Sequence, residues 1–191
     1  MTDTLFSISD SAVAQQLISG AVGVLPTDTV YGIVCRADDP IAVARLYELK
    51  HREHKPGTVI AADVDQLVEL GLKRRYLTPV MQYWPGAVSV VIPSWHELEY
   101  LHQGVQSLAV RIPAIPSIQD LLRQTGPLLT SSANHPGQPP AVNVPQAQDY
   151  FGTTVDFYVD GGDVSANKPS TIIRIVDDAV EVLRSGAVTI N

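Results

Sequence analysis

The sequence predicts a mixed α/β fold, in which helices flank a twisted sheet of parallel and antiparallel strands. Helix-like and strand-like segments are both frequent, but they do not alternate strictly as a purely parallel sheet requires. Late in the chain, two strand-like runs at 171–176 and 180–183 are separated only by a turn at Asp177-Asp178, which favours an antiparallel pair. The length of 191 residues fits a single domain over residues 1–191.

The first half of the chain carries two clear helix starts. Ser9 or Asp10 can cap a helix over 9–19 that Gly20 ends. Asp39 followed by Pro40 predicts a helix that runs to about Lys50, because aspartate caps helices and proline is tolerated at the first helical position. The other elements expected here are strands at 21–25, 31–35 and 58–62, and helices at 64–70 and 73–83.

The second half is predicted to be richer in strands, because runs of β-branched residues recur between turn signals. The expected elements are, in order, strands at 87–92 and 108–112, a helix at 118–123, a strand at 128–130, a proline-rich surface loop at 138–145, and strands at 156–159, 171–176 and 180–183.

Composition and charge indicate a globular protein that does not bind nucleic acid over a wide surface. Hydrophobic residues make up 45% of the chain and charged residues 17%, which is enough for a core. The net charge of −7 argues against a broad electrostatic grip on nucleic acid, although a local patch can still bind phosphate. The single cysteine, Cys35, cannot form an internal disulfide, and neither a signal peptide nor a run of ~20 apolar residues is present. We therefore expect a cytoplasmic protein with no membrane segment.

Small hydroxyl residues recur just after the apolar strand runs. They are Thr27 and Thr29, then Thr130, Ser131 and Ser132 together with Asn134, and finally Ser170. Strand ends in α/β sheets often bind ligands, and hydroxyl groups hydrogen-bond well to phosphates and carboxylates. Turn and cap formation explains any one of these clusters equally simply. Three clusters at three strand ends favour a binding site.

The densest positive charge in the chain is the segment K-H-R-E-H-K at 50–55. Lys50 and Arg52 would lie at the end of a helix, where the helix dipole favours cations whatever their function. The functional interpretation is a phosphate clamp, since arginine offers a planar fork and lysine a point charge. His51 and His54 lack the cysteine or carboxylate partners of common metal sites, so no metal site is predicted there.

Arg111 and Arg184 each follow an apolar strand run. An arginine that leaves a buried strand is costly unless it meets an anion, which can be a ligand or a structural acidic residue; the sequence leaves both open. The run Lys73-Arg74-Arg75 is expected to be the solvated face of a helix. The loops G-x-x-x-x-G-K-[ST] and G-x-G-x-x-G are absent, as is a G-x-S-x-G turn, so a nucleotide site here must use a different cradle.

Seven short motifs, in this order, resemble those of the YrdC-like domain family. They are P-T-D-T-V-Y-G at 26–32, K-H-R at 50–52, W-P-G at 84–86, S-L-A-V-R at 107–111, S-S-A-N-H-P-G at 131–137, S-T-I at 170–172 and L-R-S-G at 183–186. Each motif is short, but the ordered set is specific and covers about residues 20–186. The chain is most similar to the short, TsaC-type members, which lack the additional C-terminal domain of longer relatives.

The resemblance implies an L-threonylcarbamoyladenylate synthase, a nucleotidyltransferase. Such an enzyme combines L-threonine, bicarbonate and ATP, releases pyrophosphate, and supplies threonylcarbamoyl-AMP for modification of adenosine 37 in tRNA. It implies Mg²⁺ arriving with ATP, no protein-held metal, and hand-over of the product to the tRNA threonylcarbamoyl-transfer machinery. Carried over by position, the threonine-binding residues would be Thr29, Arg111, Thr130 and Ser170. The ATP-binding residues would be Lys50, Arg52, Lys55, Ser107, Ser132, Asn134 and Arg184, with Lys50 and Arg52 catalytic.

Several positions depart from the family pattern. Glu53 stands where the family often has proline, and Lys55 follows Arg52 after three residues instead of four. The other departures are Pro136, Pro140 and Ser185. They bear most on substrate preference, so two alternatives stay open: a related carbamoyl-transfer or nucleotide-binding enzyme, and a weakly binding RNA module. Asp28 receives no role, since a structural hydrogen bond and a ligand contact are both compatible with its position.

Overall fold

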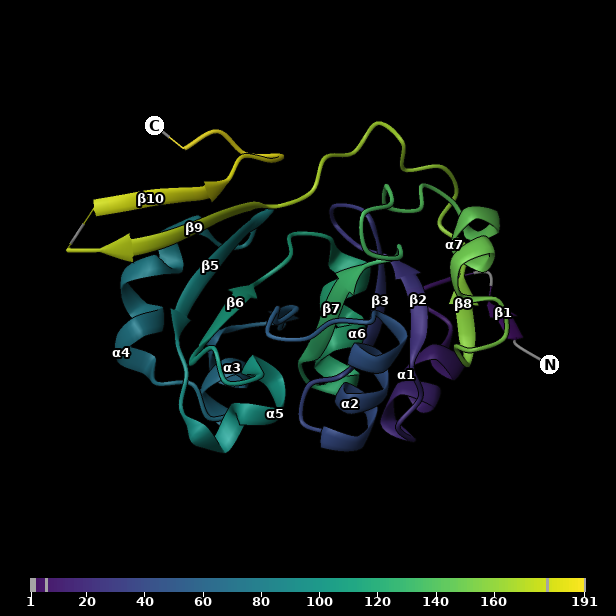
Figure 1. The fold of residues 1–191 in the computed structure, drawn as a ribbon, viewed down its shortest axis with the longest axis horizontal. Coiled ribbons are helices and arrows are strands. Elements are labelled where there is room, and N and C mark those ends of the chain that lie inside the picture. Colours follow the sequence, from purple (N-terminus) through teal and green to yellow (C-terminus); the bar gives the residue numbers. More distant parts are fainter. Residues whose placement is uncertain (1–2, 6, 178, 191) are drawn as a thin grey trace.

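The computed structural model describes residues 3–5, 7–177 and 179–190, and its centre is one ten-stranded sheet in the order β1-β8-β2-β3-β7-β4-β6-β5-β9-β10 (Figure 1). The strands are β1 (Asp3–Leu5), β2 (Gly23–Pro26), β3 (Tyr31–Arg36), β4 (Thr58–Ile60), β5 (Val88–Pro93), β6 (Ser107–Arg111), β7 (Leu128–Ser132), β8 (Phe157–Val159), β9 (Thr171–Val176) and β10 (Ala179–Arg184). Parallel pairs such as β4–β6 and β5–β9 occur beside antiparallel pairs such as β3–β7 and β9–β10, which confirms the predicted mixed sheet.

The helices are α1 (Ser11–Ile18), α2 (Pro40–Leu49), α3 (Val64–Glu69), α4 (Arg74–Leu77), α5 (Glu99–His102), α6 (Pro116–Thr125) and α7 (Val144–Phe151), with 3-10 helices η1 (Thr78–Tyr83) and η2 (His96–Leu98). Both predicted caps are confirmed: the Asp10 carboxylate accepts from the Ala12 amide, and the Asp39 carboxylate accepts from Ile41 and Ala42. Side-chain acceptors are effective there because the first amides of a helix have no partner within it.

The structure differs from the predicted elements in several places. The helix expected at 73–83 is divided into α4 and η1, because Pro79 cannot donate the hydrogen bond that would continue an α-helix. Helix α7 begins at Val144, inside the region 138–145 that was taken for a proline-rich loop, and α5 and strand β1 were not predicted. The turn expected at Asp177-Asp178 is only partly described, since Asp178 lies outside the described residues; Asp177 has a φ of 49°.

Two hydrophobic cores lie on the two faces of the sheet. Helices α1 and α6 cover one face, where Leu17 and Leu121 pack with Ile60 of β4. The other core contains Leu46 of α2, Leu101 of α5 and Ala147 of α7. Each fully buried leucine or isoleucine contributes roughly 1.5–3 kcal/mol, so the two layers fix the strands that carry the polar residues.

Strand register places the polar residues on the face that α1 and α6 cover. Thr130 of β7 pairs with Thr58 of β4, which pairs with Ala109 of β6, so these three side chains point to one side. Thr58 and Thr130 are each two residues away along their strands from Ile60 and Leu128, so they share a face with these two residues, which are buried under the helices. The face therefore continues past the apolar packing into a polar region.

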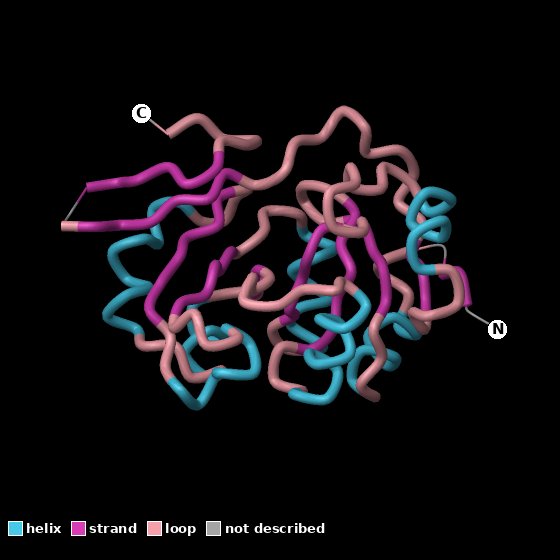
Figure 2. The backbone as a smooth tube through the Cα atoms, in the orientation of Figure 1, coloured by secondary structure: helices cyan, strands magenta, loops and turns pink. Residues whose placement is uncertain are grey.

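A long segment, residues 160–170, connects β8 to β9 across the width of the sheet. Figure 2 shows it as a loop that passes over the strand ends from the side of β8 and α7 to the β9–β10 hairpin. The Tyr31 hydroxyl holds its start, accepting from the Gly161 amide at 2.8 Å and donating to the Gly162 carbonyl at 2.9 Å. In the described part of the chain, every helix is too short or too polar to traverse a bilayer.

Candidate functional site

Two cavities of different size meet at Arg52 and Ser132. The larger is a cleft of about 850 Å³, and the smaller is a pocket of about 140 Å³. The cleft falls in the 300–1,000 Å³ range usual for ligand sites, whereas the pocket suits a molecule no larger than an amino acid. Arg52 and Ser132 line both cavities, so a ligand in one can contact a ligand in the other.

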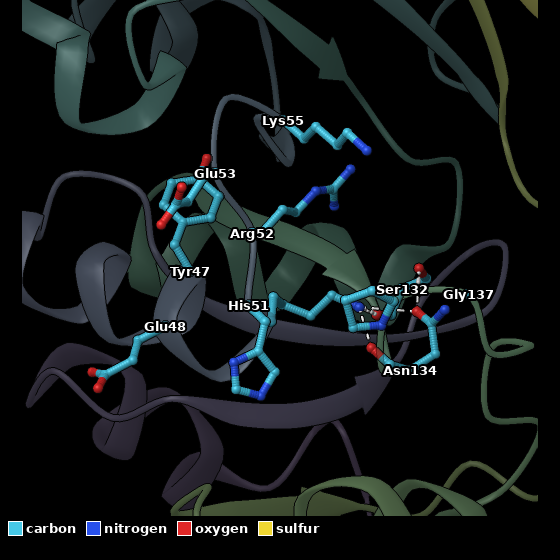
Figure 3. A pocket seen from close by; sticks show the side chains of 11 residues that line it. Tyr47, Glu48, His51, Arg52, Glu53, Lys55, Ser132, Asn134 and Gly137 are labelled. Atoms are coloured by element: carbon cyan, nitrogen blue, oxygen red, sulfur yellow. Dashed lines mark hydrogen bonds between the residues drawn. The ribbon is translucent and has the colours of Figure 1, made fainter.

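Arg52 is presented by the C-terminal end of helix α2. The His51 amide donates to the Glu48 carbonyl and the Arg52 amide to the Tyr47 carbonyl, with a φ of 46° at His51. These are the two hydrogen bonds of a Schellman motif, in which glycine usually takes the left-handed position. The motif turns the chain sharply out of α2, and Figure 3 shows the Arg52 and Lys55 side chains projecting in the same direction while Glu48 points away.

Lys50 is buried, and its ammonium group organises the loop after β7. It donates to the Ser132 carbonyl at 2.7 Å, to the Asn134 side-chain oxygen at 2.9 Å, and to the Asn134 carbonyl. These contacts use all three ammonium hydrogens. Burial lowers the pKa of Lys50 to about 8, and the neighbouring charge of Arg52 acts in the same direction.

The Ser131–Asn134 region completes the junction of the cavities. The Arg52 guanidinium donates to the Ser131 hydroxyl at 2.5 Å, and the Ser132 hydroxyl donates to the Asn134 side-chain oxygen at 2.7 Å. Partial burial lowers the pKa of Arg52, which nevertheless stays charged because the usual value for arginine is so high. The loop is thus held by two cations from one helix end.

A chain of buried polar groups forms the wall of the small pocket. The Arg111 guanidinium donates to the Asp28 carboxylate at 2.9 Å and to the Ser89 hydroxyl at 3.0 Å. The Ser89 hydroxyl in turn donates to the Ser170 hydroxyl at 3.0 Å. The Asp28 and Arg111 side chains are only 5% and 4% exposed, so their ion pair is strongly shielded from water.

Arg184 reaches the same wall from the hairpin edge. Its guanidinium turns inward to the Ser170 carbonyl at 2.7 Å, although the residue as a whole is exposed. A bulge between Val182 and Arg184 pairs Arg184 with Ile172, which lines the pocket. Partial burial lowers the pKa of Arg184, and the nearby positive charges of Arg111 and Arg52 lower it further. Three guanidinium groups thus surround a pocket with one carboxylate partner, an arrangement that attracts anions.

Threonine residues also line the pocket. The Thr27 hydroxyl donates to the Val30 carbonyl at 2.7 Å, so the Thr29 hydroxyl, 3.0 Å away, is the donor to Thr27. The lone pairs of Thr29 then remain available to accept from a bound ammonium or hydroxyl group. A Cβ at Gly32 would lie 2.5 Å from the Thr130 hydroxyl oxygen, which explains why glycine is needed beside Thr130.

Most of the residues singled out from the sequence are brought together. The small pocket is lined by Thr29, Arg111, Thr130, Ser170 and Arg184, and the cleft by Lys50, Lys55 and Asn134, with Arg52 and Ser132 in both. Ser107 lines neither cavity and lies at the start of β6. Asp28, left without a role by the sequence, pairs with Arg111, and Ser89 was missed because no motif marks it.

Within the described ranges, no group of three histidine, cysteine, aspartate or glutamate side chains is arranged to hold a metal ion. Mg²⁺ commonly binds through one or two protein ligands with nucleotide phosphates and waters. The donors around the cleft, which are amide, hydroxyl and cationic groups with Glu48 and Glu53 at its margin, fit an ion that is carried mainly by a nucleotide.

The family model Sua5_yciO_yrdC, described as "Telomere recombination", matches residues 15–186. The chain belongs to this family. The resemblance drawn from the seven motifs is therefore confirmed, over nearly the same range.

Relatives of this Sua5/YciO/YrdC chain include named enzymes and solved structures. It is 36% identical over 177 residues to the threonylcarbamoyl-AMP synthase of Chromohalobacter salexigens, which covers 90% of this chain and 94% of the relative. It is similar to P. abyssi Sua5 complexed with L-threonine, with a TM-score of 0.84 and 26% identity, over 97% of this chain and 57% of that one. This chain therefore spans little more than half of that Sua5 chain. E. coli YciO shares the fold, with a TM-score of 0.81 and 22% identity over 97% of this chain and 96% of that one.

The buried Asp28–Arg111 pair generates a stability prediction. Replacing Asp28→Asn leaves the Arg111 guanidinium buried without a countercharge, and we expect the free energy of unfolding to fall by about 3 kcal/mol. Urea unfolding monitored by circular dichroism measures the change. The control is Asp120→Asn, which removes an exposed pair with Arg123 at 2.6 Å and should cost less than about 1 kcal/mol. Equal losses in the two variants would contradict the structural importance of the buried pair.

Proposed function

We propose that this protein is an L-threonylcarbamoyladenylate synthase, which forms threonylcarbamoyl-AMP and pyrophosphate from L-threonine, bicarbonate and ATP. The observation that carries the proposal is the junction of an amino-acid-sized, arginine-rich pocket with a nucleotide-sized cleft at Arg52 and Ser132. The name of the Chromohalobacter salexigens relative and the threonine complex of P. abyssi Sua5 support it.

Threonine would occupy the small pocket. Its carboxylate suits Arg111, which Asp28 and Ser89 hold in a fixed orientation, because a planar guanidinium can bind a carboxylate through two parallel hydrogen bonds. Thr29, Thr130 and Ser170 supply hydroxyl groups for the substrate's amine and side-chain hydroxyl. The amine would then be directed toward Arg52 and Ser132, where the two cavities meet.

ATP would occupy the cleft. Arg52 and Lys55 point into it and would contact the phosphates, with Ser132 and Asn134 beside them. Arg184 lines the small pocket and would reach the phosphates from that side. The three ammonium hydrogens of Lys50 are already used, so we assign Lys50 to holding the Ser132–Asn134 backbone beside the phosphates. Ser107 would need a contact outside either cavity, and it is the weakest member of the ATP set.

The chemistry requires two bonds to form in sequence. The neutral amine of threonine attacks the carbon of bicarbonate, water leaves, and a carbamate results. A carbamate oxygen then attacks the α-phosphorus of ATP, and the bond to pyrophosphate breaks. Both steps concentrate negative charge between the cavities, where Arg52 and Arg184 can stabilise it without forming a covalent intermediate.

Mg²⁺ would arrive with ATP and neutralise phosphate charge. The labile product would pass to the tRNA threonylcarbamoyl-transfer machinery, which implies a cytoplasmic location. Direct RNA contact would be weak, because the net charge of the chain is −7.

The proposal is tested by supplying ATP, L-threonine and bicarbonate with Mg²⁺ and measuring pyrophosphate and threonylcarbamoyl-AMP. Both products should appear together and depend on threonine. Pyrophosphate release that does not depend on threonine would exclude the synthase function. RNA binding that persists in moderate salt, without any adenylate chemistry, would favour an RNA-binding module.

The arginines at the junction should contribute to turnover and not to folding. Arg52→Ala and Arg184→Ala should each lower kcat by about 10²–10³, the usual effect of removing a group that stabilises developing charge. The matched control is Arg174→Ala on the same hairpin, whose guanidinium pairs with Glu181 at 2.6 Å; it should leave turnover nearly unchanged. Loss of folding in the junction variants, seen by circular dichroism, would assign these arginines a structural role instead.

The lowered pKa of Lys50 predicts a pH dependence of nucleotide binding. The ammonium form, with three donors, predominates below its pKa of about 8 and is lost above it, so the Ser132–Asn134 backbone should loosen as pH rises. We expect the Kd for a non-hydrolysable ATP analogue, measured calorimetrically from pH 7 to 9.5, to increase through about pH 8. Lys50→Met should abolish this increase in Kd with pH. Lys55→Met should weaken binding but retain the increase. A constant Kd in the wild type would contradict the role of the ammonium.

A further inference from the structure

The segment that carries Arg52 and Lys55, residues 50–57, does not hold its shape by itself. His51 and His54 have φ values of 46° and 52°, in the left-handed region that side chains with a Cβ rarely adopt. Each such residue costs about 1–2 kcal/mol, so the conformation depends on contacts from elsewhere in the fold. We call this segment the phosphate loop.

Gln103 supplies those contacts through three hydrogen bonds. Its side-chain nitrogen donates to the Arg52 carbonyl at 2.9 Å, and its side-chain oxygen accepts from the Lys55 amide at 3.0 Å. Its main-chain carbonyl accepts from the His54 ring at 3.0 Å. One residue, 48 positions or more away in sequence, therefore brackets the part of the loop between the two cations.

The backbone around Gln103 explains why it can reach the loop. Gln103 is the C-cap of α5, with a left-handed φ of 49°, and its amide donates to the Glu99 carbonyl at 2.7 Å. Helix α5 is itself fixed, because Leu101 is fully buried and its carbonyl accepts from the Tyr47 hydroxyl at 2.6 Å. Tyr47 also accepts from the Gly57 amide at 3.1 Å, so α5 anchors the end of the phosphate loop as well.

We propose that Gln103 is a positioning residue for ATP, which holds the phosphate loop so that Arg52 and Lys55 both face the triphosphate. The inference rests on the proposed function for the identity of the ligand. Gln103 belongs to none of the seven motifs and lines neither cavity, so it acts through the loop and not by touching the nucleotide. Among the residues that the structure describes, no hydrogen bond joins Gln103 to Arg111, Ser89 or Ser170 of the small pocket's wall.

The effect should therefore fall mainly on the nucleotide, because Lys55 lines only the cleft, whereas Arg52 lines both cavities. Loss of one or two neutral hydrogen bonds typically changes an equilibrium by about tenfold, and here that change would appear in ATP affinity. Threonine affinity should change by less than about twofold, because the Asp28–Arg111–Ser89 wall stays intact.

The test uses two substitutions at Gln103 in the full-length protein. Gln103→Gly keeps the left-handed backbone, which glycine adopts without strain, and removes both side-chain bonds. Gln103→Glu keeps an acceptor for the Lys55 amide and loses the donor to the Arg52 carbonyl. The control is Gln106→Gly in the same turn, where φ is 60° and the side chain forms no hydrogen bond with the rest of the described chain.

Three measurements are made on each protein: the Kd of a non-hydrolysable ATP analogue, the Kd of L-threonine, and hydrogen exchange at the Lys55 amide. Gln103→Gly should raise the ATP-analogue Kd about tenfold and accelerate Lys55 exchange, with threonine binding unchanged. Gln103→Glu should retain Lys55 protection and give an intermediate Kd. Gln106→Gly should match the wild type in all three.

Faster Lys55 exchange with an unchanged ATP-analogue Kd would overturn the positioning role and leave the proposed function intact. Equal weakening of ATP and threonine binding would also overturn it, since it would indicate general disruption. A wild-type protein that releases no threonine-dependent pyrophosphate would instead refute the proposed function, while exchange at Lys55 still decides whether Gln103 holds the loop.

Discussion

The structure depends on keeping several cations close together in a site that is partly shielded from water. Arg111 and Lys50 are buried, Arg52 is half-buried, and Arg184 turns its guanidinium inward from the exposed edge. Removing such groups from water is costly unless hydrogen bonds and opposite charge compensate. Asp28 compensates Arg111, and backbone carbonyls and serine hydroxyls accept from the others. The remaining positive charge makes the site selective for anionic ligands.

The fold brings these cations together from three elements that are far apart in sequence. Lys50 and Arg52 come from the end of α2, Arg111 from β6 and Arg184 from β10. Each cation is held by its own hydrogen-bond acceptors: Lys50 by Ser132 and Asn134, Arg52 by Ser131, Arg111 by Asp28 and Ser89, and Arg184 by Ser170. Catalysis by positioning benefits from this arrangement, since groups that are fixed before the reaction need not reorganise during it.

The sequence predicted the helices and strands that are marked by neighbouring residues, such as helix caps. It missed the features that depend on contacts between residues far apart in the chain. Asp10, Asp39 and Pro40 act within one turn of their helices, so both helices were placed closely. Asn143 caps α7 and Pro145 is its second residue, but the surrounding prolines favoured a loop interpretation. The motif residues were found as a set. The contacts of Arg111 with Ser89 and Asp28, in contrast, join residues that are 22 and 83 positions apart and that only the folded sheet brings together. No pattern in a single sequence expresses such contacts.

The distribution of charge also separates small anions from nucleic acid as ligands. Five of the arginines outside the site pair with carboxylates, which reduces their attraction for a phosphate backbone: Arg36, Arg45, Arg74, Arg123 and Arg174. A polyanion needs a continuous basic surface, because its affinity grows with the number of phosphates neutralised. A nucleotide needs only the few cations that converge on one cleft. The overall charge of −7 repels the polyanion at long range, while the short screening distance of about 8 Å at physiological salt leaves the local field of the cleft intact. The distribution of charge therefore favours a small anionic ligand over an extended phosphate backbone.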